Sequence, residues 1–145
     1  MSESRITLNL TSDVEGLARV TEALEVFCRD HGVPDEWAME LNIVLDETLT
    51  NTMFHGADGN DGPDRLRIKV DVEIADGALI VRQEDNGRAF DPLQAPEVDT
   101  TAPLEDRAVG GLGIHLIRKL MDGLAYARTD GLNVLTMKRY LAARG

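Results

Sequence analysis

The chain has 145 residues and a mass of 15.9 kDa, which is enough for a single domain over residues 1–145 with a substantial hydrophobic core. Its 15 Lys and Arg residues stand against 26 Asp and Glu residues, and the formal charge of −11 argues against nucleic acid or an anionic membrane surface as a partner. Apolar runs such as Ala78–Val81 are far shorter than a membrane span of roughly 20 residues, and Met1–Arg5 lacks the apolar core of a signal peptide, so we expect a cytoplasmic protein.

The N-terminal part of the chain predicts one strand followed by two helices. Arg5–Thr11 alternates apolar and polar side chains, which is the period of a half-buried strand. Ser12 and Glu15 then form a capping box, in which each side chain satisfies a free backbone N–H at a helix start. This first helix ends at Gly32. The second spans about Asp35–His55, because this stretch has no Gly or Pro and its apolar residues recur at spacings of three and four.

A glycine-rich loop and two strands follow. Gly56–Pro63 has the composition of a helix C-cap and a loop. Leu66–Ile74 alternates apolar and charged side chains, and Asp76–Gly77 is a two-residue turn of the kind that joins antiparallel strands. The next strand covers Leu79–Asp85, and its alternation places Asp85 on the apolar face.

A long loop, a short helix and a second hairpin complete the chain. Pro92–Val109 contains prolines and acidic residues without periodicity, and its length in so small a domain suggests a functional lid. A helix opens at Gly110–Gly113, and Leu124–Arg128 and Val134–Tyr140 form a hairpin around Asp130–Gly131. This order predicts an α+β fold, a two-layer sandwich in which helices cover one face of a mostly antiparallel sheet.

Three motifs carry polar chemistry, and the first lies on the second helix. Glu47, Asn51 and His55 recur every four residues, which places a carboxylate, an amide and an imidazole in one row. A carboxylate there can remove a proton from a hydroxyl, and an amide oxygen is a hard ligand suited to Mg²⁺. Taken alone, the same spacing also fits a solvated helix face, and the helix dipole favours a histidine at a helix C-terminus.

The second motif is Asp85-Asn-Gly-Arg-Ala-Phe-Asp-Pro92, at the end of a strand. A buried carboxylate without a partner is costly, and a ligand amine such as the exocyclic nitrogen of adenine would supply the hydrogen bond to Asp85. Gly87 would let a flat base approach the backbone, because it has no Cβ. A local turn capped by the Asp85 side chain is equally compatible with these residues.

The third motif is Gly110-Gly-Leu-Gly113 at a helix N-terminus. Exposed backbone N–H groups and the helix dipole make phosphate the expected ligand of such a turn. The Gly-Lys-Ser/Thr of a P-loop is missing, and a long loop precedes the glycines where a Rossmann site has a strand. A glycine-rich turn without a ligand is the alternative.

In the order of these motifs, the chain resembles one superfamily of ATP-binding domains. This superfamily has the Bergerat-type fold and includes the domains of gyrase, a heat-shock chaperone, histidine kinases and mismatch-repair ATPases. Within it, the chain is most similar to small anti-sigma factors that are serine protein kinases. Leu45–Asn51 matches the asparagine box of the family, Asp85–Pro92 its adenine box, and Gly110–Ile117 its second glycine box. The resemblance covers nearly the whole chain.

The resemblance implies a role for each matching residue. Glu47 would be the general base and Asn51 the ligand of Mg²⁺. Asp85, Gly87 and Ala89 would form the adenine site. The residues that would lie at the phosphates are Gly110, Gly111, Leu112 and Gly113, with Arg107 acting on the terminal phosphate and His55 nearby.

The implied function is that of an anti-sigma regulator that binds Mg-ATP and phosphorylates a serine or threonine of an anti-anti-sigma antagonist. Unphosphorylated antagonist would capture the regulator, and phosphorylated antagonist would release it to hold a sigma factor. The resemblance also implies a homodimer. One rival is a non-enzymatic ATP-binding module that sequesters a partner, although simple binding needs no base at Glu47. Another is a histidine kinase, but neither His31 nor His115 occupies a position that suits a phospho-accepting histidine.

Overall fold

A computed structural model describes residues 5–11, 14–56, 66–89, 91 and 111–140. Its elements, in chain order, are β1 (Arg5–Thr11), α1 (Val14–Asp30), α2 (Asp35–Gly56), β2 (Arg67–Ala75), β3 (Ala78–Asp85), α3 (Gly111–Leu120), β4 (Gly123–Thr129) and β5 (Leu132–Tyr140). Each predicted helix and strand is present, and β4 and β5 begin slightly earlier than expected. Ser12 of the predicted capping box and the predicted lid at 92–109 lie outside the described residues. None of the described helices combines the length and hydropathy that a bilayer crossing requires.

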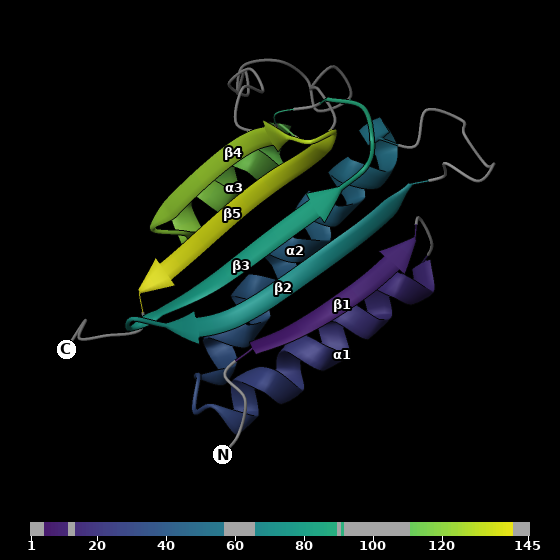
Figure 1. Ribbon diagram of the computed structural model, residues 1–145. Helices are drawn as coiled ribbons and strands as arrows, with labels where there is room; N and C mark the ends of the chain where they lie inside the picture. Colours follow the sequence, from purple (N-terminus) through teal and green to yellow (C-terminus); the bar gives the residue numbers. More distant parts are fainter. Residues whose placement is uncertain (1–4, 12–13, 57–65, 90, 92–110, 141–145) are drawn as a thin grey trace.

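The strands form one sheet in the order β1-β2-β3-β5-β4, and every neighbouring pair is antiparallel. The three helices of the described residues lie against one face of this sheet (Figure 1), which confirms the predicted two-layer α+β fold. After β3 the chain passes through α3 to the outer strand β4, and β5 then returns between β3 and β4. This return places Asn133 of β5 directly opposite Asp85 of β3.

The core lies between the sheet and the helices. Alternate residues of each central strand point into it, as the sequence pattern predicts, and each fully buried aliphatic side chain contributes roughly 1.5–3 kcal/mol. The largest fully buried side chains are Leu24, Leu41, Val44, Leu45, Leu49, Ile68, Val70, Val72, Leu79, Val81, Ile117 and Met137. Because α2 supplies several of them, its orientation on the sheet is fixed, and so is the direction in which its polar row points.

Two hairpin turns and one helix end depend on left-handed backbone. Asp76 and Gly77 have φ values of 53° and 75°, and Asp130 and Gly131 have values of 53° and 80°. Two successive positive φ angles define the hairpin turns that favour Asp-Gly. Gly32, with a φ of 71°, lies in the same region just after the end of α1 at Asp30, and the N–H of Val33 donates to the carbonyl of Cys28 at 2.8 Å.

The only cysteine in the chain, Cys28, gives a test of this packing. It is 1% exposed, and burial raises the pKa of its thiol to about 11. Because the thiolate is the reactive form, we expect the native protein to resist iodoacetamide at pH 8 and the urea-denatured protein to react fully. Mass spectrometry measures both, and rapid stoichiometric alkylation of native protein would contradict the buried position.

Candidate functional site

The three motifs predicted separately from the sequence meet at one end of the molecule. α2 ends there at Gly56, β3 ends there at Asp85, and α3 begins there at Gly111 (Figure 1). α2 and α3 also pack against each other on the same face of the sheet. Segments far apart in the sequence are thus gathered at one edge of the fold.

Asp85 lies at the centre of this end. Its side chain is buried, at 6% exposure. Oδ1 accepts hydrogen bonds from the backbone N–H of Gly87 and from Nδ2 of Asn133, both at 2.9 Å. Within the described part of the chain, no donor contacts Oδ2. One carboxylate oxygen therefore fixes the side chain, and the other is left as an acceptor for a donor of a ligand.

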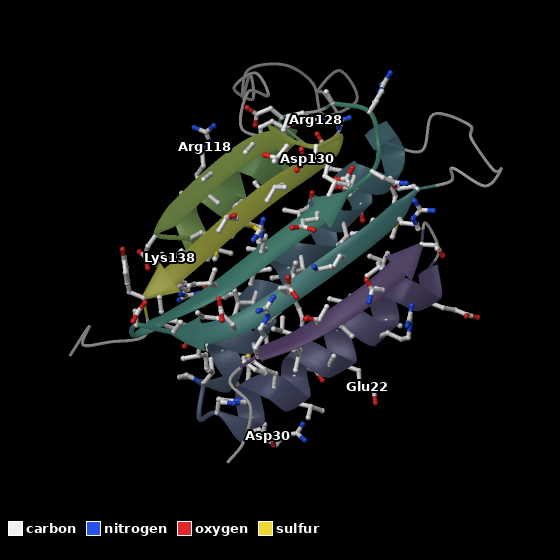
Figure 2. The ribbon with its side chains drawn as sticks, in the orientation of Figure 1. Glu22, Asp30, Arg118, Arg128, Asp130 and Lys138 are labelled. Carbon is white, nitrogen blue, oxygen red and sulfur yellow. The ribbon has the colours of Figure 1, made fainter. Side chains whose placement is uncertain are left out.

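The hairpin of β4 and β5 holds the segment after Asp85 in place. Nδ2 of Asn133 also donates to the carbonyl of Arg88 at 2.8 Å, and Nη1 of Arg128 donates to the carbonyl of Gly87 at 2.8 Å. The hydroxyl of Tyr126 donates to Oδ1 of Asn133. Figure 2 shows Arg128 close to the β4–β5 turn, at the end of the molecule where β3 finishes. Sequence reasoning missed these supporting residues, because they depend on the return of β5 beside β3.

The charge of Asp85 is balanced between opposing effects. Burial raises the pKa of this carboxyl, while the hydrogen bonds from Asn133 and Gly87 and the positive charge of Arg128 lower it, and burial dominates. The native state thus holds the Asp85 proton more tightly than the unfolded chain does. Keeping the carboxylate ionised at neutral pH costs folding free energy.

This balance predicts a pH dependence of stability. Because the native pKa of Asp85 is raised, its contribution to stability falls as pH rises from the ordinary aspartate value of about 4 through the native value. Asp85→Asn should remove this contribution, so that the free energy of unfolding of the nucleotide-free variant declines less between pH 4 and 7 than that of the wild type. Urea unfolding at several pH values measures the difference, and identical pH dependence in both proteins would contradict it.

Glu47 and Asn51, in the polar row on α2, have side chains that a ligand could contact. Glu47 is half-buried, and Asn51 is 9% exposed. Neither side chain makes a hydrogen bond or ion pair with the described residues. A carboxylate and an amide that lack partners among the described residues, one helical turn apart, are available to a ligand.

Gln83 joins this helix to the strand that ends in Asp85. Its side chain is 2% exposed, and Nε2 donates to the hydroxyl of Thr52 at 2.7 Å and to the carbonyl of Thr48 at 3.4 Å. Oε1 of Gln83 is buried without a partner among the described residues. Gln83 and Asp85 share one face of β3, so this contact sets the position of α2 relative to Asp85. Sequence reasoning missed Gln83, although its place between Val81 and Asp85 on the apolar face was a signal.

The remaining predicted site residues are described only in part. Gly87 is buried and Ala89 is exposed after the end of β3. Gly111, Leu112 and Gly113 form the first turn of α3, and His55 lies in the last turn of α2, but the side chains of Leu112 and His55 lie outside the description. Arg107 and Gly110 lie outside the described residues. No group of three or more His, Cys, Asp or Glu side chains that could hold a metal occurs within the described ranges.

Comparison with known proteins gives consistent matches. The profile of the histidine kinase-like ATPase domain matches residues 10–139. Serine/threonine-protein kinase BtrW of Bordetella bronchiseptica is 33% identical over 118 residues, covering 74% of this chain and 77% of that protein. Serine-protein kinase RsbW of Listeria monocytogenes is 30% identical over 138 residues, covering 92% of this chain and 86% of that protein. An anti-sigma F factor of Clostridium botulinum is 27% identical, covering 86% of this chain and 85% of that protein.

A solved structure supports the fold independently. The histidine kinase AdeS of Acinetobacter baumannii superposes with a TM-score of 0.51 at 16% identity, over 99% of this chain and 70% of that chain. At this identity the similarity supports the arrangement of the helices and the sheet, and it carries no information on activity.

Proposed function

Because the chain belongs to the family of histidine kinase-like ATPase domains, we propose that it is an anti-sigma regulator that uses ATP to phosphorylate a serine or threonine of an anti-anti-sigma antagonist. The relatives named as serine kinases and as an anti-sigma factor support this activity, as does the match of the family profile to most of the chain. We also propose that residues 1–145 form a single such domain.

The observation that carries the proposal is the carboxylate of Asp85. Its Oδ1 is fixed by Gly87 and Asn133, and its Oδ2 has no donor among the described residues, at the end of the molecule where α2 and α3 meet β3. The exocyclic amine of adenine is a donor that would satisfy Oδ2. Gly87 and Ala89 would lie beside the base, and the backbone N–H groups of the first turn of α3 would bind phosphate oxygens.

Asn51 is the residue that fits a magnesium ion. Its amide is almost buried and has no partner among the described residues, and its oxygen is a hard ligand. Mg²⁺ that accompanies ATP needs only one or two protein ligands, since phosphate oxygens and water complete its coordination. We propose that Asn51 holds this ion, which would neutralise charge on the phosphates when bound.

We assign the role of general base to Glu47. Its half-buried carboxylate has no hydrogen-bond or ion-pair partner in the described part of the chain, and it lies one helical turn before Asn51. In the proposed reaction Glu47 accepts the proton of the antagonist hydroxyl as the hydroxyl oxygen bonds to the γ-phosphorus, and ADP leaves with the former bridging oxygen. The phosphate contacts that we assign from the family motifs are Gly110, Gly111, Leu112 and Gly113, with Arg107 on the terminal phosphate and His55 near it.

The partners in this proposal are proteins. Antagonist phosphorylation would release the regulator to bind a sigma factor, so that a local charge change decides which partner is held. We further propose a homodimer that works in the cytoplasm, where sigma factors and ATP are found, and that has no direct contact with nucleic acid or membrane. The formal charge of −11 supports the exclusion of nucleic acid.

A phosphotransfer assay tests the activity. The purified protein is incubated with radiolabelled ATP and Mg²⁺ and with each anti-anti-sigma protein encoded in the source genome. Label should appear on a serine or threonine of one of them, and EDTA should prevent the transfer. Binding of Mg-ATP without transfer to any of them would instead identify a non-enzymatic module, and failure to bind ATP would overturn the nucleotide site itself.

A further inference from the structure

A groove between α1 and α2 is not explained by the nucleotide site. It encloses about 650 Å³, and it follows α2 from Asp35 at the start of the helix to Glu47. The α1 side is formed by exposed residues one turn apart, Glu25 and Arg29 among them. The groove therefore runs along both helices and ends at the carboxylate that we propose as the general base.

The groove exposes apolar side chains that the fold does not use. Met39 is 66% exposed and Ile43 is 43% exposed, and they lie one helical turn apart on α2. The other large hydrophobic residues that are exposed in the described part of the chain are Val26 and Tyr140, and neither lines this groove. A pair of apolar residues at this spacing beside a second helix is suited to the apolar face of a partner helix.

The charged residues around the groove indicate what charge the partner should carry. Among the described residues that line it, Glu25, Asp35, Asp46 and Glu47 are acidic and Arg29 is the one cation. Among the described residues, none of these carboxylates forms an ion pair. Their negative charges can therefore attract cationic groups of a molecule bound in the groove. Such an excess of negative charge favours a partner segment with Lys or Arg beside its apolar residues.

We propose that this groove docks the protein substrate of the kinase through a basic amphipathic helix. The inference rests on the proposed function, because it is the role of Glu47 as base that requires a substrate hydroxyl at this end of the groove. Docking along Met39 and Ile43 brings the bound protein to Glu47 and leaves the contacts of Asp85 untouched. The groove thus determines which protein is phosphorylated, and the nucleotide site determines which nucleotide is used.

Binding of a synthetic peptide tests the groove without any need for kinase activity. The probe is a fluorescein-labelled, amidated peptide of Leu and Lys, with Leu at helical spacings of three and four; a scrambled peptide of the same composition lacks the apolar face. The test variant is Met39→Lys with Ile43→Lys, and the matched control is Val26→Lys, because Val26 is 43% exposed like Ile43 but lies on α1 outside the groove.

The double variant should bind the amphipathic peptide about tenfold more weakly or worse, because it loses apolar contact and gains like charge. The control should bind it as the wild type does, and the scrambled peptide should bind poorly to all three proteins. Equal affinity for the double variant and the wild type, no preference over the scrambled peptide, or no binding to the wild type would each overturn the proposal. Ile43→Ser repeats the test without an added charge.

Kinetics with a phosphorylated antagonist separate docking from catalysis. With the antagonist found in the phosphotransfer assay, the double variant should show a KM about tenfold higher for the antagonist, with kcat and the Kd for Mg-ATP unchanged. An unchanged KM would overturn the docking role even if the peptide binds. If no antagonist is phosphorylated, the proposed function fails, while the peptide experiment still decides whether the groove binds basic helices.

Discussion

Glu47→Gln is expected to bind Mg-ATP as the wild type does and to transfer phosphate to the antagonist roughly 10² to 10⁴ times more slowly, the usual contribution of a general base. Glutamine keeps the size of the side chain but cannot accept the proton of the attacking hydroxyl. Because the side chain of Glu47 makes no hydrogen bond or ion pair with the described residues, its replacement breaks no polar contact there. Equilibrium binding of ATP and single-turnover transfer to the antagonist measure the two properties separately.

Two further variants serve as controls for Glu47→Gln. Glu36→Gln removes an exposed carboxylate from the first turn of the same helix, away from the site, and should leave both binding and transfer unchanged. Asn51→Ala should instead weaken nucleotide binding in Mg²⁺ and narrow the difference between Mg²⁺ and EDTA, because a ligand of the ion is lost. Full-rate transfer by Glu47→Gln would remove the general base from the mechanism and leave catalysis to positioning alone.

Much of the fold could be predicted from the sequence, because its signals are local. The alternation around Val70 and Val72 predicts a strand, and the two Asp-Gly pairs predict hairpin turns that the positive φ values confirm. The stretch without Gly or Pro that begins at Asp35 gives the longest of the described helices. These features depend on residues within a few positions of one another, and their number limits the arrangement to a sheet with helices on one face.

The order of the strands could not be predicted in the same way. Nothing local to β4 or β5 says that β5 returns between β3 and β4, since that choice depends on how α3 packs against α2 and the sheet. The partners of Asp85 follow from this choice. Asn133 lies 48 positions further along the chain and Arg128 holds Gly87 from 41 positions away, so their roles appear only once the sheet is assembled.

For the site, too, the sequence motifs predict the residues, but the contacts of these residues depend on how the sheet is assembled. The family motifs predict Glu47, Asn51 and Asp85 as site residues, but they do not predict which oxygen of Asp85 lacks a donor among the described residues. The hydrogen bonds from Gly87 and Asn133 occupy Oδ1, and no donor in the described ranges contacts Oδ2. The contact of Gln83 with Thr52 likewise fixes how β3 and α2 are spaced, which no motif describes. The motifs indicate which residues matter, and the packed sheet determines how they are presented.

Asp85→Asn should lower the affinity for ATP by about 1–3 kcal/mol, or about 5- to 150-fold, and erode discrimination against GTP. The side-chain oxygen of asparagine can still accept from Gly87 and Asn133, so the amide nitrogen would take the place of Oδ2. That nitrogen cannot accept from the amine of adenine, but it can donate to the carbonyl oxygen of guanine. Calorimetry with both nucleotides in Mg²⁺ measures the change in preference.

Asp71→Asn provides the matched control for this variant. Asp71 is also buried, at 7% exposure, but it lies on the face of β2 away from the helices, where it accepts from Thr7 and pairs with Arg5 at 3.3 Å. Its replacement removes a buried carboxylate on the opposite face of the sheet from Asp85 and should leave both nucleotide affinities unchanged. Equal loss of ATP affinity in both variants would mean that removing a buried charge disturbs the whole sheet, whereas unchanged ATP affinity in Asp85→Asn would remove Asp85 from the adenine site. A loss confined to Asp85→Asn, together with a gain in relative affinity for GTP, requires direct contact between this side chain and the base.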